Sequence, residues 1–327
     1  MKNIFNFIII LLLSMTYTIL HAQHSTKFVF VETAPEHVKK AMQNNTNVVF
    51  EVINNAYYLH KQELNFSTSN INQEAIKRVQ ALWETSSFYC TETEVITRIL
   101  RLNKPNNELL GWQVRNINVF FTQGDEDYRS QDIVIEYSSD GKISDMYIAI
   151  KWHQPEQMIN VMSEVTDLRH RQVILGFVEG FRTAYNRKDI DFLNKVFSND
   201  ALIITGKVLK SQKSGDVPQP IGTNIEYIKQ TKKEYLSRLS KVFDNNKYIN
   251  IKFEDIKVKR HDVNPNIYGV TLRQKWHTSN YHDDGWLFLI IDFENEENPL
   301  IWVRTWQPQE YIQGGGNVFV LDDYILE

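Results

Sequence analysis

Residues 249–307 read INIKFEDIKVKRHDVNPNIYGVTLRQKWHTSNYHDDGWLFLIIDFENEENPLIWVRTWQ. Four runs of this stretch are rich in the apolar, β-branched and aromatic residues that are typical of strands. Turn-forming residues separate the runs and allow each strand to return beside the one before it. The predicted strands are 249–259, 268–277, 286–293 and 300–307. The predicted turns are Asn264-Pro265-Asn266, Asp283-Asp284-Gly285 and 295–299.

Helical patterns precede this sheet. The spacing of apolar residues before Arg187 predicts a helix whose buried face consists of Ile174, Phe177, Val178, Phe181 and Tyr185. A short helix at 191–197 and a strand at 201–209 follow. A loop at 211–223 leads to Asn224, which we interpret as the N-cap of a long helix. The apolar face of that helix consists of Ile225, Ile228, Tyr235, Leu239, Val242 and Phe243. Helices followed by a bent antiparallel sheet predict an α+β cone with a cavity at one end.

The first half of the chain has the same order of helices and then strands. One helix is indicated by Ile76, Val79, Leu82 and Trp83, and an earlier one by Val48, Val49, Val52 and Ile53. The strands expected after them are 95–102, 112–122, 132–137 and 143–150. Asp140-Gly141 lies between the last two and is a hairpin turn signal. The sequence therefore predicts a second α+β unit in this half.

The N-terminus has the pattern of a secretory signal. A basic start, the apolar residues 8–13 and a small residue at Ala22 occur in the order that such signals require. We expect cleavage after Ala22 and export to a periplasm, with an uncleaved membrane anchor as the alternative. The predicted organisation is a signal at 1–22, an N-terminal α+β domain at 23–152, a linker at 153–164 and a C-terminal domain at 165–327.

Cysteine content and charge exclude several classes of protein. Cys90 is the only cysteine, so no disulfide can form within the chain and no thiolate zinc site can be built. It lies too far from the signal to be the lipidated residue of a lipoprotein. We expect a small buried filler at Cys90, and a reactive thiol is the alternative. The net charge is −4, so nucleic acid is not an expected partner, and no stable membrane insertion is expected after signal removal.

One segment resembles a known superfamily. The run Phe177-Val178-Glu179-Gly180-Phe181-Arg182-Thr183-Ala184-Tyr185-Asn186, then Lys188-Asp189, then Phe197-Ser198-Asn199-Asp200-Ala201-Leu202-Ile203-Ile204 is similar to the opening of nuclear transport factor 2-like proteins. The segment from Gly285 to Pro308 is similar to uncharacterised exported members from Bacteroidetes bacteria. The resemblance covers about residues 165–310, and the N-terminal domain is a possible divergent repeat. It implies a cone-shaped fold that serves enzymes such as ketosteroid isomerase and scytalone dehydratase, and also binding and dimerisation modules.

Strand alternation suggests a pocket in the C-terminal cone. If the aromatic faces of the last three strands are the concave ones, six side chains converge on a mostly apolar cavity, as a small-molecule site requires. These residues are Gln274, Trp276, Trp286, Asp292, Trp302 and Arg304. Asp292 is the candidate general base and Arg304 the candidate clamp for an anionic group. The alternative is a structural Asp–Arg pair, with the tryptophans filling the cone or forming a dimer face.

Metal and cofactor sites are not predicted. His277 and His282, with Asp283 and Asp284 beside the latter, surround one hairpin, but their spacing matches no strong metal motif. We therefore interpret them as parts of a solvated turn and expect no cofactor.

Two functional hypotheses follow. The first is an exported, non-catalytic protein that binds a small ligand or a protein partner through its second domain, because no catalytic set is recognisable. The second is a cofactor-independent isomerase, dehydratase or hydrolase that uses Asp292 as its base. A homodimer formed through the aromatic sheet face is a third possibility.

Overall fold

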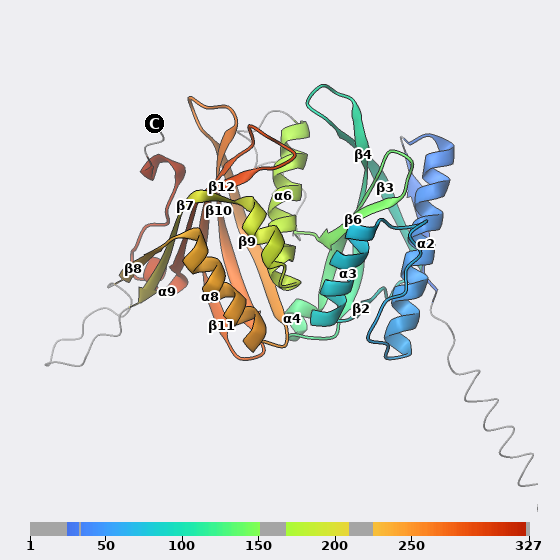
Figure 1. The fold of residues 1–327 in the computed structure, drawn as a ribbon, viewed down its shortest axis with the longest axis horizontal. Coiled ribbons are helices and arrows are strands. Elements are labelled where there is room, and N and C mark those ends of the chain that lie inside the picture. Colours follow the sequence, from blue (N-terminus) through green and yellow to red (C-terminus); the bar gives the residue numbers. More distant parts are fainter. Residues whose placement is uncertain (1–24, 33, 151–167, 209–224, 325–327) are drawn as a thin grey trace, which may run out of the picture.

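The computed structural model describes residues 25–32, 34–150, 168–208 and 225–324 (Figure 1). The predicted signal at 1–22, the linker at 153–164 and the loop at 211–223 lie outside these residues. Among the described helices, none is both long enough and apolar enough to cross a membrane. Two sheets, each packed against helices, follow one another along the chain, so the predicted α+β class is confirmed.

The first half is a six-stranded sheet with two helices on one face (Figure 1). Its elements are β1 (Lys27–Val31), α2 (Glu36–Tyr58), α3 (Gln73–Thr85), β2 (Phe88–Tyr89), β3 (Glu94–Asn103), β4 (Leu109–Phe121), α4 (Glu126–Arg129), β5 (Ser130–Tyr137) and β6 (Ile143–Ile148). The strand order is β1-β3-β4-β5-β6, with β2 paired to β4. Apolar residues of α2, α3 and the facing side of the sheet form one core that includes Phe50, Trp83 and Ile135. Cys90 is buried in this core, as expected, and its burial raises the pKa of the thiol.

Local sequence signals explain the ends of these elements. The side chain of Asn72 accepts a hydrogen bond from the backbone N–H of Ala75 at 2.7 Å and caps the first turn of α3. The hairpin between β5 and β6 turns at Asp140-Gly141, as predicted, with Gly141 at a φ of +90°. β1 was not expected, and it pairs in parallel with β3 at the edge of the sheet.

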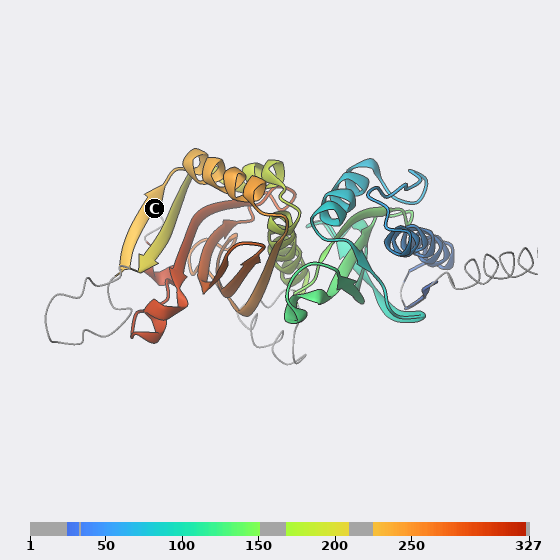
Figure 2. The same cartoon turned by 90° about the horizontal axis from the view of Figure 1, so that it is seen from below.

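The second half is a bent six-stranded sheet covered by two long helices (Figure 2). Its elements are α6 (Leu168–Asn186), α7 (Ile190–Val196), β7 (Phe197–Val208), β8 (Ile225–Gln230), α8 (Lys232–Asn245), β9 (Ile249–Arg260), β10 (Ile267–Thr278), β11 (His282–Asp292), β12 (Leu300–Pro308), α9 (Gln309–Gln313) and the 3-10 helix η1 (Leu321–Asp323). The strand order is β8-β7-β12-β11-β10-β9. Apolar residues of α6, α8 and the inner face of the sheet form a second core.

The predicted start of the long helix at 225 is wrong. Residues 225–230 form the edge strand β8, and α8 begins after Thr231. Thr231 and Glu234 form a capping box, in which each side chain bonds the backbone N–H of the other residue. The spacing of Ile225 and Ile228 fits a helix and that of Ile225 and Tyr227 fits a strand, and pairing with β7 satisfies the backbone of this segment.

The predicted turn at Asp283-Asp284-Gly285 is also wrong. β10 continues to Thr278 and β11 begins at His282, so these three residues lie inside a strand. The chain turns between them at 279–281, where the backbone N–H of Thr278 bonds the carbonyl of Tyr281 at 2.9 Å. Backbone pairing along β11 therefore overrides the local turn preference.

Helix α6 lies between the two sheets (Figure 1). One side carries apolar residues such as Phe181 into the second core. The other side carries three buried polar residues toward the first half: Glu179, Arg182 and Thr183. The two halves therefore meet across a polar contact surface.

Each of these three residues bonds the first half. Glu179 forms a buried ion pair with Arg115 of β4 and accepts the backbone N–H of Ile150 at 2.8 Å. The Nη1 atom of Arg182 donates to the carbonyl of Ala149 at 2.9 Å. The hydroxyl of Thr183 accepts the N–H of Ile148 at 2.9 Å. The side chains of α6 therefore bind the backbone at the end of β6 and one charged side chain of the first sheet.

A buried carboxylate lies in the same surface. Glu136 of β5 accepts hydrogen bonds from the hydroxyl of Tyr147 at 2.7 Å and from the side chain of Gln113 at 3.1 Å. Burial is the largest influence on this group and, with the negative charge of Asp145 nearby, it raises the pKa of Glu136 despite the two donors.

Replacing Glu179 by Gln should lower the free energy of unfolding by about 3 kcal/mol. The substitution keeps the shape of the side chain but leaves the buried Arg115 guanidinium without its counter-charge. Glu74→Gln is the matched control, because Glu74 pairs with Lys77 on the exposed surface of α3, and it should cause no measurable loss of stability. Urea unfolding followed by circular dichroism measures both values. Equal losses in the two variants would contradict the assigned role.

Glu136→Gln should change how stability depends on pH. Because the native pKa of Glu136 lies above the unfolded value of 4.5, the folded chain holds this proton longer than the unfolded chain does. The wild type should therefore lose stability relative to Glu136→Gln as the pH rises from about 4.5 toward neutrality, whereas below that pH the two curves should run parallel. Urea midpoints measured from pH 4 to pH 8 give this difference. A difference that stays constant with pH would contradict the raised pKa.

Candidate functional site

The structure does not bring the six predicted site residues together on one face. Leu289 of β11 lies opposite Val270 of β10 and opposite Arg304 of β12, so these three side chains share one face of the sheet. Gln274, Trp276 and Arg304 lie on this inner face, which the helices cover. Trp286 and Asp292 belong to the alternate residues of β11, whose side chains lie on the outer face. Trp302 sits at a register shift between Ile301 and Val303 and is 39% exposed.

The expected convergence of Asp292 and Arg304 is therefore wrong. Asp292 ends β11 on the outer face, where its side chain accepts the backbone N–H of Glu294 at 2.8 Å. Arg304 points to the opposite side and is 5% exposed. Alternation relates residues within one strand, but it does not say which residues of two neighbouring strands share a face. The turns set the pairing of the strands, and a change of one residue in that pairing moves a side chain to the other face.

The outer aromatic face is largely covered by the end of the chain. Phe288, Ile290 and Val303 form a small cluster with Leu321 of η1, and Phe319 packs against it. Trp286 is half-buried nearby, and its indole N–H donates to the side chain of Gln309 at 2.7 Å. The tryptophans expected to line one pocket or one dimer face thus occupy separate environments.

An aromatic and cationic cluster lies on the inner face instead. The guanidinium of Arg304 lies 4.9 Å from the centre of the Tyr235 ring, a cation–π contact. The hydroxyl of Tyr235, from α8, lies 2.7 Å from the hydroxyl of Tyr185, from α6. The ring of Tyr185 in turn meets Trp276 edge to face at 5.7 Å. Two helices and two strands therefore contribute to this cluster.

Three buried polar atoms on this face have no hydrogen-bond partner among the described residues. They are Gln274 Oε1, Arg304 Nε and Trp306 Nε1. Gln274 lies opposite Gly285 on the neighbouring strand. A Cβ atom at Gly285 would lie 2.7 Å from the indole of Trp306, so the glycine allows that ring to rest against β11. Unpartnered buried polar groups are costly and uncommon, which marks this face as a candidate binding site.

A carboxylate lies on the same face beside this cluster. Asp283 pairs with Trp276 across β10 and β11. Burial raises the pKa of Asp283 to about 6, while a hydrogen bond from Tyr281 acts in the opposite direction. The residue belongs to the segment expected to be a turn, so the sequence pattern gave no reason to place it beside the inner face.

Other members of the inner cluster were also missed. The sequence predicts Tyr185 and Tyr235 only as parts of apolar helix faces, and Trp306 only as part of the strand at 300–307. A tyrosine on a buried helix face is a usable signal, because its hydroxyl requires a polar partner in the core. The identity of that partner depends on which helices meet, and local sequence does not specify this.

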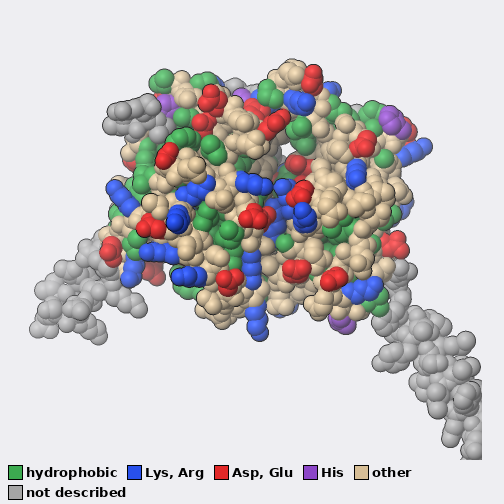
Figure 3. Space-filling view, viewed as in Figure 1, with side chains coloured by type: hydrophobic (Ala, Val, Ile, Leu, Met, Phe, Trp, Pro, Cys, Tyr) green, Lys and Arg blue, Asp and Glu red, His purple; other side chains and the backbone are tan. Residues whose placement is uncertain are grey.

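A separate cleft of about 470 Å³ lies between the two halves. Its walls carry Arg78 and Arg187, and both arginines form ion pairs with Asp145. Figure 3 shows basic and acidic side chains interspersed over the middle of the face in view. Asn103 Oδ1 and the Nε and Nη1 atoms of Arg187 are buried here without a hydrogen-bond partner among the described residues, so this cleft also offers unsatisfied polar groups.

Comparison with known proteins yields structural similarity without a sequence family. No family model matches the chain, and no curated protein matches it. A nuclear transport factor 2-like protein from Cytophaga hutchinsonii is 16% identical, with 42% of this chain and 97% of that chain covered at a TM-score of 0.29. A putative dehydratase of the same family from Streptomyces avermitilis is 12% identical, with 42% and 94% covered at 0.30. A naphthalene 1,2-dioxygenase chain is 8% identical, with 50% and 90% covered at 0.35. Structures of these two kinds therefore match about half of the chain.

Proposed function

We propose that this chain is an exported, non-catalytic binding protein that holds a small ligand in the cone of its second half. In this proposal residues 1–22 direct export to the periplasm and are removed, 23–152 form the N-terminal domain, and 153–164 link it to a nuclear transport factor 2-like domain at 165–327. The order of charged, apolar and small residues at the N-terminus supports export. The helices followed by a bent sheet support the domain assignment.

The observation that carries the proposal is the set of unpartnered atoms on the inner face. Arg304 Nε and Trp306 Nε1 can only donate hydrogen bonds, and Gln274 Oε1 can only accept one. Two donors, one of them charged, suit a carboxylate, whose oxygens accept several hydrogen bonds. The single acceptor suits a hydroxyl group of the same ligand.

Aromatic rings define the rest of the ligand. Tyr185, Tyr235 and Trp276 surround this face, and rings of this kind bind a flat apolar body by edge-to-face or stacked contacts. A small hydroxylated aromatic acid combines the three features. We therefore propose this class of compound, with the carboxylate toward Arg304 and Trp306 and the hydroxyl toward Gln274.

The enzymatic alternative receives less support. It required Asp292 to act as a base beside Arg304 in one pocket, and these side chains lie on opposite faces of the sheet. Asp292 is therefore not placed to abstract a proton from a ligand on Arg304, and the carboxylate on the inner face is that of Asp283.

Trp306→Phe should weaken the binding of 4-hydroxybenzoate about tenfold or more. The substitution keeps an aromatic ring but removes the N–H donor, and a hydrogen bond to a charged acceptor contributes about 1.5–3 kcal/mol. Trp302→Phe is the matched control, because Trp302 is exposed at the strand bulge, and its affinity should equal that of the wild type. Isothermal titration calorimetry on the full chain measures the dissociation constants.

A second probe tests the role of the carboxylate. 4-Hydroxybenzyl alcohol has the ring and hydroxyl but no charge, and it should bind at least tenfold more weakly than 4-hydroxybenzoate. The proposed ligand class is wrong if the wild type binds neither compound at millimolar concentration. It is also wrong if the two tryptophan variants lose affinity equally.

A further inference from the structure

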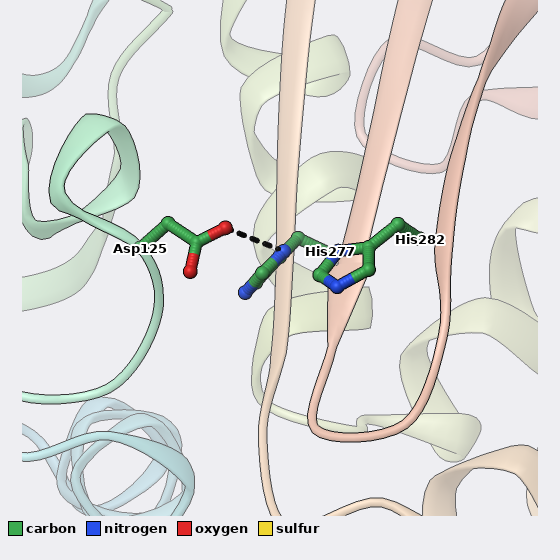
Figure 4. Close-up of side chains that lie close together, drawn as sticks. All are labelled: Asp125, His277 and His282. Atoms are coloured by element: carbon green, nitrogen blue, oxygen red, sulfur yellow. Dashed lines mark ion pairs between the residues drawn. The ribbon is translucent and has the colours of Figure 1, made fainter.

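Two histidines and an aspartate meet at the junction of the two halves (Figure 4). We propose that Asp125, His277 and His282 form a zinc site that joins the halves of the chain. Each residue offers one ligand atom, and the three atoms all lie within 4.8 Å of one another. The site is separate from the inner face of the cone and does not depend on the proposed ligand.

The hairpin brings the two histidines together. His277 near the end of β10 pairs directly with His282 at the start of β11, and their ring centres are 4.2 Å apart. This pairing follows from the tight turn at 279–281. The third group, Asp125, immediately precedes α4 in the first half. Sequence spacing could not reveal this set, because its carboxylate comes from the other half of the chain.

The shortest of these separations fits tetrahedral zinc. Two ligands at about 2.0–2.2 Å from a tetrahedral zinc ion lie about 3.4 Å apart. The Oδ2 atom of Asp125 and the Nδ1 atom of His277 are 3.4 Å apart. His282 is exposed, so its ring can rotate to close the remaining distance.

Aromatic neighbours hold His277 with one nitrogen toward the proposed ion. The residue is 3% exposed, and its ring stacks on Tyr128 at 4.9 Å and lies nearly parallel to Tyr248. Its Nε2 atom lies 3.2 Å from the hydroxyl of Tyr248. When Nε2 donates to that hydroxyl, Nδ1 carries the free lone pair and faces Asp125. Metal-bound histidines are commonly oriented by such a contact through the second nitrogen.

Contacts between the halves also fix the position of Asp125. The side chain of Asn250, on β9, donates to the carbonyl of Gln123 at 3.0 Å. Gly124 has a φ of +104°, and a Cβ atom there would lie 2.4 Å from Asn250 Nδ2. The loop that carries Asp125 therefore rests directly on the second sheet, and the backbone at Asp125 is held beside His277 before any ion binds.

The ligand set indicates the chemical class of the ion. Two imidazoles and one carboxylate suit Zn²⁺, whereas Mg²⁺ and Ca²⁺ prefer oxygen ligands only. Three protein ligands leave a fourth position for water. Because the ligands come from both halves, a bound ion links them and stabilises the folded chain in proportion to its affinity.

Zinc titration of the full chain tests this proposal. Any purification tag is removed, metal is stripped with chelator, and Zn²⁺ binding is measured by calorimetry, with the visible absorption of Co²⁺ as a probe of coordination. The wild type should bind one Zn²⁺ per chain and melt at a higher temperature with Zn²⁺ present, while Mg²⁺ and Ca²⁺ should have no effect. His282→Ala and Asp125→Asn should each weaken Zn²⁺ binding at least tenfold.

The control variant is His37→Ala, which removes an exposed histidine on α2 in the first half. It should bind Zn²⁺ like the wild type. His282→Ala and Asp125→Asn alter exposed side chains, so both should fold, and their circular dichroism spectra check this. The proposal is overturned if the wild type binds no Zn²⁺ at 100 µM, or if His282→Ala binds it as tightly as the wild type.

Discussion

The buried ion pair between Glu179 and Arg115 is the contact on which the arrangement of the molecule depends. A charge removed from water requires a counter-charge and hydrogen bonds in a defined geometry. Glu179 is fully buried on α6, and its partner comes from the first sheet. The carboxylate on the helix can therefore meet its counter-charge only when the two halves meet in the observed way. Apolar packing alone would allow many relative positions of the halves.

The same helix organises the interior of the second half. Its apolar side faces the bent sheet and brings the hydroxyl of Tyr185 to that of Tyr235 on α8. These rings lie beside Arg304, which β12 directs inward. On the other side, Arg182 donates a hydrogen bond to a carbonyl of each half, at Ala149 and Ile251. Burial lowers the pKa of Arg182 to about 10, and the group remains charged at neutral pH. One helix thus connects the junction of the halves with the candidate site.

The sequence predicted the fold class and most elements, because hydrophobic periodicity is a local property. The helices of the first half, the Asp140-Gly141 hairpin and the last four strands follow from such patterns. The exceptions have a common cause. Residues 225–230 and Asp283-Asp284-Gly285 have ambiguous or turn-like local patterns, and pairing with neighbouring strands decides their structure.

The candidate site was less predictable than the fold. The expectation that Gln274, Trp276 and Arg304 share a face agrees with the strand pairing. Alternation relates the first two residues within β10, and the observed register places Arg304 of β12 on the same side. The prediction that Asp292 shares this face is wrong, because the turns at both ends of β11 set its register against the neighbouring strands. The site also includes Tyr185 and Tyr235, whose meeting depends on helix packing, and the proposed zinc ligands meet only when the two halves dock.

The central claim is that the buried contacts of α6 make the two halves one cooperative unit. Differential scanning calorimetry of the full chain in metal-free buffer tests this claim most directly. We predict a single transition whose calorimetric enthalpy equals its van't Hoff enthalpy. Two separate transitions, or a calorimetric enthalpy about twice the van't Hoff value, would contradict it, because the halves would then unfold independently.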